Sequence, residues 1–500
     1  MEPHPHRRTF FVASCIALTV TGFSFSIRPE IIGELQGEFG WTEEQMGWLN
    51  GPGFWGFTLA MMFGGPFCDW LGMKKLIGLA FLGHLLGTVL SIFAGPVAEL
   101  SGIDPFVTLY TGYLLLGVGC GLIEAACNPL IATMYPDEKT KRLNHFHAWF
   151  PVGLVVGGLS AYGVNQLSAG EMDWLNWQWK LGIMIVPTII YGVMFLPHTL
   201  PVTERVASGV STGRMFTACL SPLFIVMLVA MLLTAATELG PNTWIPDIIN
   251  YTIGIPGILV LVWISGLMAV GRQFAGPVVG KLTPIGVLLA AAVFSGLGLF
   301  LLSAAGSAAM VYVAATVFAV GVCYFWPTML GFVSERMPDT GALGLSVFGG
   351  AGMLSAAFIL PIMGGIYQVN TQQAIPEEYK QRVLALVPDE PPAGATEEEI
   401  ESWQLAQDNP DLYVRNTLAA QAAADSASEE SAMWLEAKAE GGATTLRAVS
   451  LIPVGLLVIF GGVYAFDRRS RRLGTRDDAG QPDDAVSPLA SPPPAPPSQR

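Results

Sequence analysis

Charged side chains are scarce in this sequence. Asp, Glu, Lys and Arg make up only 13% of its 500 residues, and 52% of the residues are hydrophobic. Soluble domains average about 25% charged residues, so the composition excludes an ordinary water-soluble protein. The segment 368–446 holds 15 acidic and 4 basic residues, which is −11 of the net charge of −14. We interpret this segment as a solvated acidic loop rather than a cation-binding site.

The sequence also lacks the motifs of several catalytic and metal-binding classes. Its six cysteines lie in or beside apolar runs, and none shows CxxC spacing or suggests a disulfide framework. No Walker sequence, zinc-type histidine cluster or nucleophile elbow occurs. ATP-driven transport and hydrolysis have no support, so we expect no enzyme activity, cofactor, metal or nucleic-acid partner.

What the sequence has instead is a succession of apolar runs. Each is about 20 residues long, which is enough to cross a bilayer as a helix. A helix forms all of its backbone hydrogen bonds within one segment, as lipid requires. We predict an all-α integral membrane protein with twelve transmembrane helices in two six-helix halves. The helices are expected near 9–33, 45–67, 76–95, 107–134, 145–166, 179–197, 216–240, 256–280, 284–304, 309–333, 343–367 and 447–466.

Basic residues follow the alternation that twelve spans would produce. Lys and Arg in short connections favour the cytoplasmic side, and with twelve spans they fall on one face. They are Arg7, Arg8, Lys74, Lys75, Lys139, Lys141, Arg142, Arg205, Arg214, Arg468, Arg469, Arg471 and Arg472. We therefore expect a multi-pass protein of the cell (inner) membrane with both termini in the cytoplasm.

These expectations divide the chain into six parts. They are a first half (1–197), a cytoplasmic central loop (198–215), helices 7–11 (216–367), an acidic extracytoplasmic insert (368–446), helix 12 (447–466) and a disordered cytoplasmic tail (467–500). In the insert, Thr396 and Glu399 have the spacing of a helix capping box. Asn409 and Pro410 are typical of a second helix start. We expect short surface helices there.

A short internal sequence repeat supports the division into halves. "GPFCDWL" begins at Gly65, at the end of helix 2, and "GPVVGKL" begins at Gly276, at the end of helix 8. Both read Gly-Pro-x-x-x-x-Leu, six spans apart. Repeated halves are a common build for secondary transporters.

The stretch Gly65-x-x-x-Asp69-x-x-Gly72-x-Lys74-Lys75 resembles the loop signature of the major facilitator superfamily, with Trp70 where Arg is usual. The resemblance covers the twelve helices, and it implies that this loop helps to hold the two halves together. Glycine permits close helix approach, and an aspartate pairs with a cation or a helix N-terminus across the interface.

A second stretch resembles the fucose permease group of sugar–proton symporters. "GLIEAACNP" and "YPDEKTKRLN" reproduce its helix 4 and following loop at Glu124, Asn128, Pro129, Pro136, Arg142, Leu143 and Asn144. The resemblance implies proton coupling and sugar recognition at Glu124. Two positions differ: Pro29 stands where that group has a coupling Asp in helix 1, and His147 and Phe150 replace a Gln and an Asn.

Ionisable groups inside membrane spans are costly and tend to be functional. Glu124 is predicted to bind solute or protons, or alternatively to form a structural ion pair. Arg28 and Glu30 either line a pathway or form an interfacial ion pair. Glu238 and Trp244 suit a sugar, or else lie at the outer interface. Arg272 pairs with Glu238, binds an anion or reaches the surface. His147 either relays protons or is a packing or hydrogen-bonded residue, and Trp326 either lines the cavity or packs.

We predict a secondary active transporter that moves a small polar solute, a sugar, by alternating access, with protons as a possible second substrate. The expected partners are the solute, protons and the lipid bilayer, and the protein is predicted to be monomeric. One alternative is an exporter or organic-anion carrier of the same fold. Another is a transporter-like sensor or assembly partner that uses the insert at 368–446.

Overall fold

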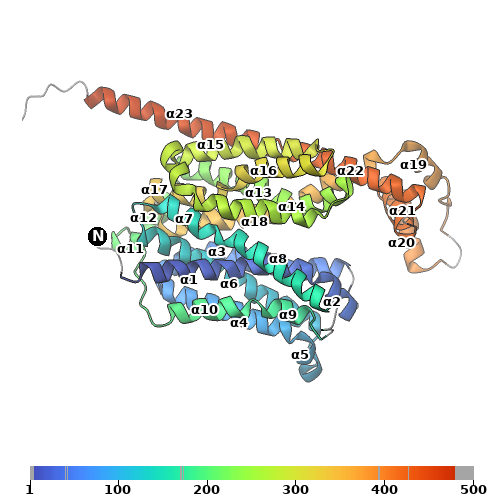
Figure 1. Cartoon of the computed structure of the whole chain (residues 1–500), viewed down its shortest axis with the longest axis horizontal. Helices are drawn as coiled ribbons and strands as arrows, with labels where there is room; N and C mark the ends of the chain where they lie inside the picture. Colours follow the sequence, from blue (N-terminus) through green and yellow to red (C-terminus); the bar gives the residue numbers. More distant parts are fainter. Residues whose placement is uncertain are drawn as a thin grey trace, which may run out of the picture.

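A computed structural model describes residues 5–39, 41, 43–168, 172, 174–391, 395–425 and 427–478. Within these ranges the regular structure is helical (Figure 1). The first half holds α1 (Arg7–Glu30), α3 (Glu43–Leu71), α4 (Met73–Ile92), α6 (Pro105–Met134), α7 (Lys139–His147), α8 (Trp149–Ser168), α9 (Trp177–Gly182) and α10 (Ile185–Phe195), with α2 (Ile32–Phe39) and α5 (Ala94–Ser101) as connectors.

The second half follows a central segment with α11 (Glu204–Ala207) and α12 (Thr212–Ala218). It holds α13 (Pro222–Ile253), α14 (Gly257–Gln273), α15 (Ala275–Ser303), α16 (Ala308–Val322), α17 (Phe325–Arg336), the 3₁₀ turn η1 (Pro338–Thr340), α18 (Gly341–Ala374), α22 (Glu429–Val449) and α23 (Ile452–Asp478). Figure 1 shows the two halves side by side, joined by the central segment.

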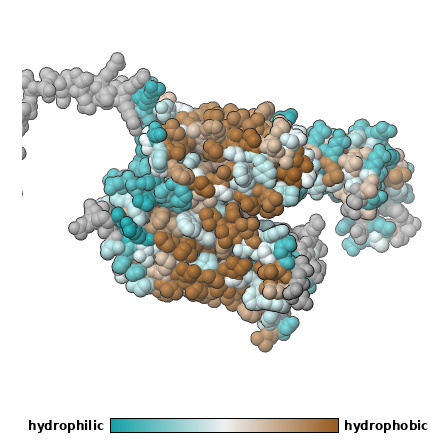
Figure 2. Space-filling view, viewed as in Figure 1, coloured by the Kyte–Doolittle hydropathy of each residue, from teal (hydrophilic) through white to brown (hydrophobic). Residues whose placement is uncertain are grey.

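Twelve spans account for these helices, as predicted. Nine stretches of the described chain are long and apolar enough to cross a membrane, and α3, α8 and the 17-residue α14 supply the remaining three. The brown belt around the bundle in Figure 2 is the surface that would face lipid. Thr283, with φ of 63°, breaks α15 between the eighth and ninth spans, because the following Pro284 disfavours helical geometry at the residue before it.

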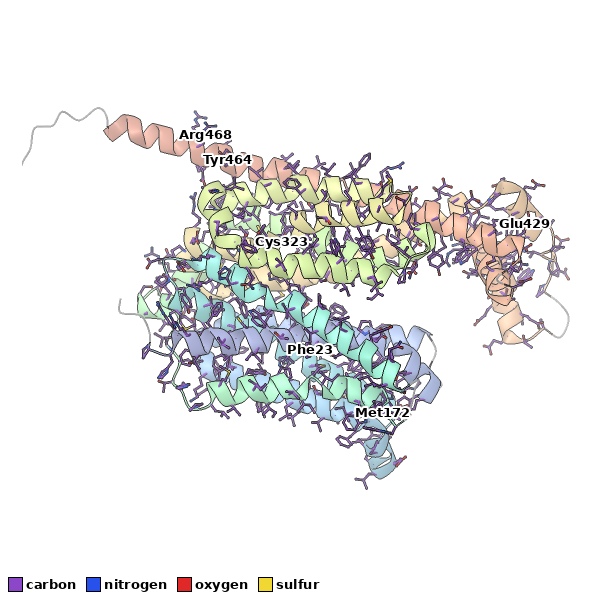
Figure 3. All side chains as sticks on the ribbon, viewed as in Figure 1. Phe23, Met172, Cys323, Glu429, Tyr464 and Arg468 are labelled. Carbon is purple, nitrogen blue, oxygen red and sulfur yellow. The ribbon has the colours of Figure 1, made fainter. Side chains whose placement is uncertain are left out.

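Some helix bounds differ from the expected ones. The eleventh span continues to Ala374, and the twelfth begins with α22 at Glu429 rather than near 447. Glu429 is labelled in Figure 3 at the far end of α22 from the bundle. The Ser428 side chain caps α22 by accepting from Ser431 N, and α22 lacks the apolar pattern that identifies a span. The hydropathy pattern therefore marks only the apolar part of a longer helical stretch.

The remaining insert is a small helical module. It contains α19 (Glu377–Leu384), α20 (Glu397–Asp408) and α21 (Pro410–Ala424). Helices α19, α21 and α22 share a separate core of Ile375, Tyr379, Val383, Val414, Leu418 and Ala437. The predicted capping box is confirmed: Thr396 and Glu399 bond reciprocally at the start of α20. The Thr396 backbone N–H and hydroxyl hold the pKa of Glu399 below its ordinary value.

Two ends of the bundle can be named from their residues. The basic face is the end that carries Arg7, Lys74, Lys75, Lys139 and Lys141, and the insert face is the end that carries residues 375–391. Figure 2 shows a notch between the two halves at the insert face. Of the predicted tail, residues 467–478 continue α23, and residues 479–500 lie outside the described residues.

Candidate functional site

A pocket lies between the two halves. Its cavity volume is about 40 Å³, which is room for a few water molecules. Each half supplies five lining residues: Phe25, Phe57, Glu124, His147 and Phe150 from the first half, and Glu238, Leu239, Arg272, Trp326 and Met353 from the second. The structure therefore brings together five of the residues predicted from sequence.

Arg272 on α14 organises the charged part of this pocket. Its Nε donates to the carbonyl of Cys323 at 2.6 Å, and Cys323 is labelled in Figure 3. Its Nη2 lies 3.4 Å from Glu238 Oε1, which confirms the predicted pair. Its Nη1 donates to the carbonyl of His147 in the other half at 2.8 Å. With only 2% of its surface exposed, Arg272 does not reach the protein surface.

Glu124 lies on α6 opposite that pair. The Asn128 amide, the Trp326 indole and the Arg272 guanidinium are its polar neighbours, and Asn128 Oδ1 lies 3.0 Å from His147 Nε2. Glu124 itself is 4% exposed. This side chain is therefore a carboxyl group held inside the bundle between both halves.

Several polar atoms of this cluster are buried and form no hydrogen bond of regular geometry among the described residues, although the Asn128 amide and the Trp326 indole face the Glu124 carboxyl. They are Glu124 Oε2, Asn128 Nδ2, Glu238 Oε2 and Trp326 Nε1. A buried group without a partner costs about 1–3 kcal/mol, and such groups call for a functional explanation. The set offers carboxylate acceptors and amide and indole donors. Hydroxyl groups, which both donate and accept, complement such a set.

Aromatic rings form the apolar wall. The Phe25 ring centroid lies 5.7 Å from that of Phe150 and 6.2 Å from that of Phe57, both nearly perpendicular. Trp326 adds a fourth ring from the second half. Sequence reasoning noted Phe150 only as a departure from the fucose permease pattern and missed Phe25 and Phe57, because Phe in an apolar span is indistinguishable from ordinary core packing.

Arg28 and Glu30 do not join the pocket, and they do not pair with each other. Arg28 is 3% exposed, and its Nε donates to the Ser24 carbonyl at 3.0 Å. Its guanidinium lies 5.3 Å from the Tyr113 ring centroid. Glu30 is exposed and accepts from Asn165 Nδ2 at 3.0 Å. The predicted interfacial ion pair is therefore wrong, since residues two positions apart on a helix lie on different faces.

Asn144 and Trp244 also lie elsewhere. Asn144 Nδ2 donates to Thr328 Oγ1 on α17 at 3.3 Å, which links the two halves on the basic side of the pocket. Trp244 Nε1 donates to the Leu360 carbonyl on α18 at 3.2 Å within the second half. Both are structural contacts in this conformation.

The predicted loop signature lies at the junction of the halves. Asp69 Oδ2 accepts from Arg205 Nε at 2.7 Å, and both side chains are buried. Thr203 Oγ1 donates to Asp69 Oδ1 at 2.5 Å. Gly65 faces α18: a Cβ on it would lie 2.7 Å from Ser346 Cβ. Gly65 and Asp69 thus act at the interface, although the cation is supplied by the central segment.

The other signature residues shape the turn. Gly72 has φ of 85° between α3 and α4, a geometry that favours glycine. Lys74 Nζ donates to the Leu196 carbonyl at the end of α10, and Lys75 is exposed. Nearby, Lys139 Nζ donates to Glu204 Oε2 at 2.7 Å and to the Ser334 carbonyl of the second half at 3.3 Å. The halves are therefore closed together at the basic face.

Two six-helix halves around a buried polar pocket define a membrane transport protein. As a family, the Major Facilitator Superfamily matches residues 9–361, and the chain belongs to it. Among solved structures, the superfamily transporter FucP in its outward conformation has a TM-score of 0.59 at 16% identity, covering 72% of this chain and 93% of that one.

Curated relatives match shorter segments. Sodium-dependent phosphate transport protein 1, chloroplastic, of Arabidopsis thaliana is 27% identical over 124 residues, 25% of this chain and 23% of that protein. Glucose transporter GlcP of Staphylococcus epidermidis (strain ATCC 12228 / FDA PCI 1200) is 26% identical over 137 residues, 27% of each chain. The chain spans about a quarter of the length of these two relatives.

Proposed function

We propose that this transporter is a secondary carrier that moves a sugar or similar polyhydroxylated solute, together with protons, by alternating access. The observation that carries the proposal is the set of buried, unpartnered donors and acceptors around Glu124 and Glu238. A solute with several hydroxyl groups satisfies both kinds of atom, and its apolar ring faces pack on Phe25, Phe150 and Trp326.

Glu124 is the proposed proton site. Burial favours the neutral form of a carboxyl group, unless a cation or hydrogen-bond donors stabilise the charged form. Arg272 is already bonded to Glu238, His147 and Cys323. Glu124 therefore interacts less with the Arg272 guanidinium than Glu238 does. It is free to gain and lose a proton as the pocket opens to either side.

The conformational cycle would use the two faces in turn. At the basic face, the Asp69–Arg205 and Lys139–Glu204 pairs hold the first half to the central segment, and Lys139 and Thr140 bond Ser334 and Glu335 of the second half. Release of these contacts would open the pocket there. We assign the basic face to the cytoplasm of the inner membrane, with residues 1–197 and 216–367 plus 447–466 as the moving halves. The central loop (198–215) and the tail (467–500) would lie inside, and the acidic insert (368–446) outside.

The test is uptake by purified protein in liposomes, with and without an imposed pH gradient. Radiolabelled neutral sugars are the probes. The proposal expects at least one of them to accumulate when a proton gradient is applied, and to equilibrate without one. Absence of uptake for all sugars, with intact folding confirmed by thermal unfolding, would overturn the sugar assignment.

A second candidate, an organic-anion carrier, is favoured by one observation. Arg28 is a buried cation without a carboxylate partner among the described residues, and its Nη1 has no hydrogen-bond acceptor. Uptake of sugar acids in place of neutral sugars, lost in Arg28→Gln and retained in Arg28→Lys, would favour this candidate over the first.

A further inference from the structure

The last helix of the insert is seated in a groove between α13 and α18 at the insert face. Two consecutive glycines of α22 permit this fit. A Cβ on Gly441 would lie 2.4 Å from Thr371 Oγ1 on α18, and one on Gly442 would lie 2.7 Å from Ile248 Cγ2 on α13. Because these two residues have no side chain, one face of α22 packs closely against both helices.

Lys438 lies on that same face, one turn before the glycines. Its Nζ donates to Asp247 Oδ2 on α13 at 3.0 Å, and its side chain is only 12% exposed. The same Nζ lies 4.2 Å from the Tyr367 ring centroid and 4.6 Å from that of Tyr251. Trp434 closes the cage at 5.8 Å. Ammonium groups bind to the faces of aromatic rings in this way.

The helix that Lys438 holds is the one that carries Glu238. Asp247 lies roughly two and a half turns beyond Glu238 on α13. Pro241 and Pro246 lie between them, and each removes a backbone hydrogen bond from the helix. The segment Pro241–Ile253 therefore depends on side contacts for its direction. Trp244, bonded to the Leu360 carbonyl of α18, is a second such contact.

We propose that Lys438 is a positioning residue for the solute pocket. By binding Asp247 it holds the insert-face end of α13 against its own half, and so keeps the pocket beside Glu238 accessible from the insert face. Closure of that face would require α13 to bend toward the first half and to strain the Lys438 contacts. The inference rests on the proposed function in one respect, since it takes the Glu238 pocket to be the solute site.

The experiment uses Leu239, a pocket residue next to Glu238, as a reporter. Leu239→Cys is placed in the full-length chain with the native cysteines replaced, and the rate of labelling by a membrane-impermeant maleimide is measured from the insert face. Lys438→Met is compared with Lys438→Arg. Lys380→Met is the matched control, because Lys380 is also largely buried but forms its ion pairs within the insert. Met353→Cys on α18 is a second reporter.

The proposal expects Lys438→Met to slow labelling several-fold at both reporters, with Lys438→Arg and Lys380→Met near the parent rate. Unchanged labelling in Lys438→Met, whether or not its unfolding temperature falls, would overturn the proposal and leave Lys438 as a structural anchor. Labelling needs no transported solute, so a failed sugar-uptake screen does not affect this result.

Discussion

Arg272 and Glu238 form an ion pair inside the bundle, with 3.4 Å between Nη2 and Oε1 and side chains that are 2% and 6% exposed. The pair belongs to the second half, yet Arg272 also donates to the His147 carbonyl of the first half. One guanidinium thus connects the Glu238 carboxylate of one half to the backbone of the other. Its removal should affect stability and transport together.

The first prediction concerns this pair. Arg272→Met leaves Glu238 without its cation, and removing one partner of a buried pair costs about 3–5 kcal/mol. The double variant Arg272→Met with Glu238→Gln should recover part of that free energy of unfolding, because no buried charge remains. Chemical unfolding of all three proteins in detergent measures the coupling. Strictly additive losses would show that the two side chains do not interact.

The second prediction concerns the closed basic face. Asp69→Asn weakens the buried bond to Arg205, so the pocket should open more often on that side. The reporter is Ala132→Cys, which lies beside Arg205 in the cavity under the central segment. We expect faster maleimide labelling from the basic face. Asp339→Asn is the control, since its pair with Arg214 is exposed and such pairs contribute about 0–1 kcal/mol. Equal labelling rates in the two variants would show that the Asp69–Arg205 bond does not hold the basic face closed.

The third prediction concerns Gly65. A Cβ there would lie 2.7 Å from Ser346 Cβ and 2.8 Å from the Ala342 carbonyl of α18. Overpacking typically costs about 1–3 kcal/mol. At Gly65 it would destabilise the conformation in which the two halves are in contact at the basic face. Gly65→Ala should therefore raise the same Ala132→Cys labelling rate. Gly78→Ala, which meets nothing within 4 Å, should leave it unchanged. A Gly65→Ala rate equal to that of Gly78→Ala would contradict the packing account.

The fourth prediction separates the insert from the bundle. Leu418 is fully buried in the insert core, and Leu→Ala substitutions in cores cost about 2–5 kcal/mol. Hydrogen exchange should accelerate throughout α19 and α21 in Leu418→Ala, while amides around Glu124 keep their protection. Faster exchange throughout the bundle would mean that the insert and the transport domain unfold as one unit.

Much of the architecture follows from the sequence. Long apolar runs fix the number of spans, and the resemblance to the superfamily's loop signature places Gly65 and Asp69 at the junction of the halves. The extension of the twelfth span into α22 could not be predicted, because its Glu429 end is polar and its contacts with α13 depend on Gly441 and Gly442. Those glycines become informative only when the neighbouring helices are known.

The site was predicted in part for a similar reason. A carboxylate or guanidinium in an apolar span stands out, so Glu124, Glu238 and Arg272 were identified. Arg28 stands out equally, yet it points among aromatic rings outside the pocket. An apolar pattern places a residue in the membrane but does not fix the rotation of its helix. Only the packed structure distinguishes a lining residue such as Phe25 from a core residue.

The central claim is that Glu124 couples protons to solute movement, and a glutamine at that position tests it most directly. Glu124→Gln removes the titratable group but keeps the shape and a hydrogen-bonding side chain. In liposomes it should lose accumulation of the solute under a proton gradient and keep exchange of labelled for unlabelled solute. Glu99→Gln, at an exposed position of α5, should keep both. Gradient-driven accumulation by Glu124→Gln at the level of the unmodified protein would contradict the claim.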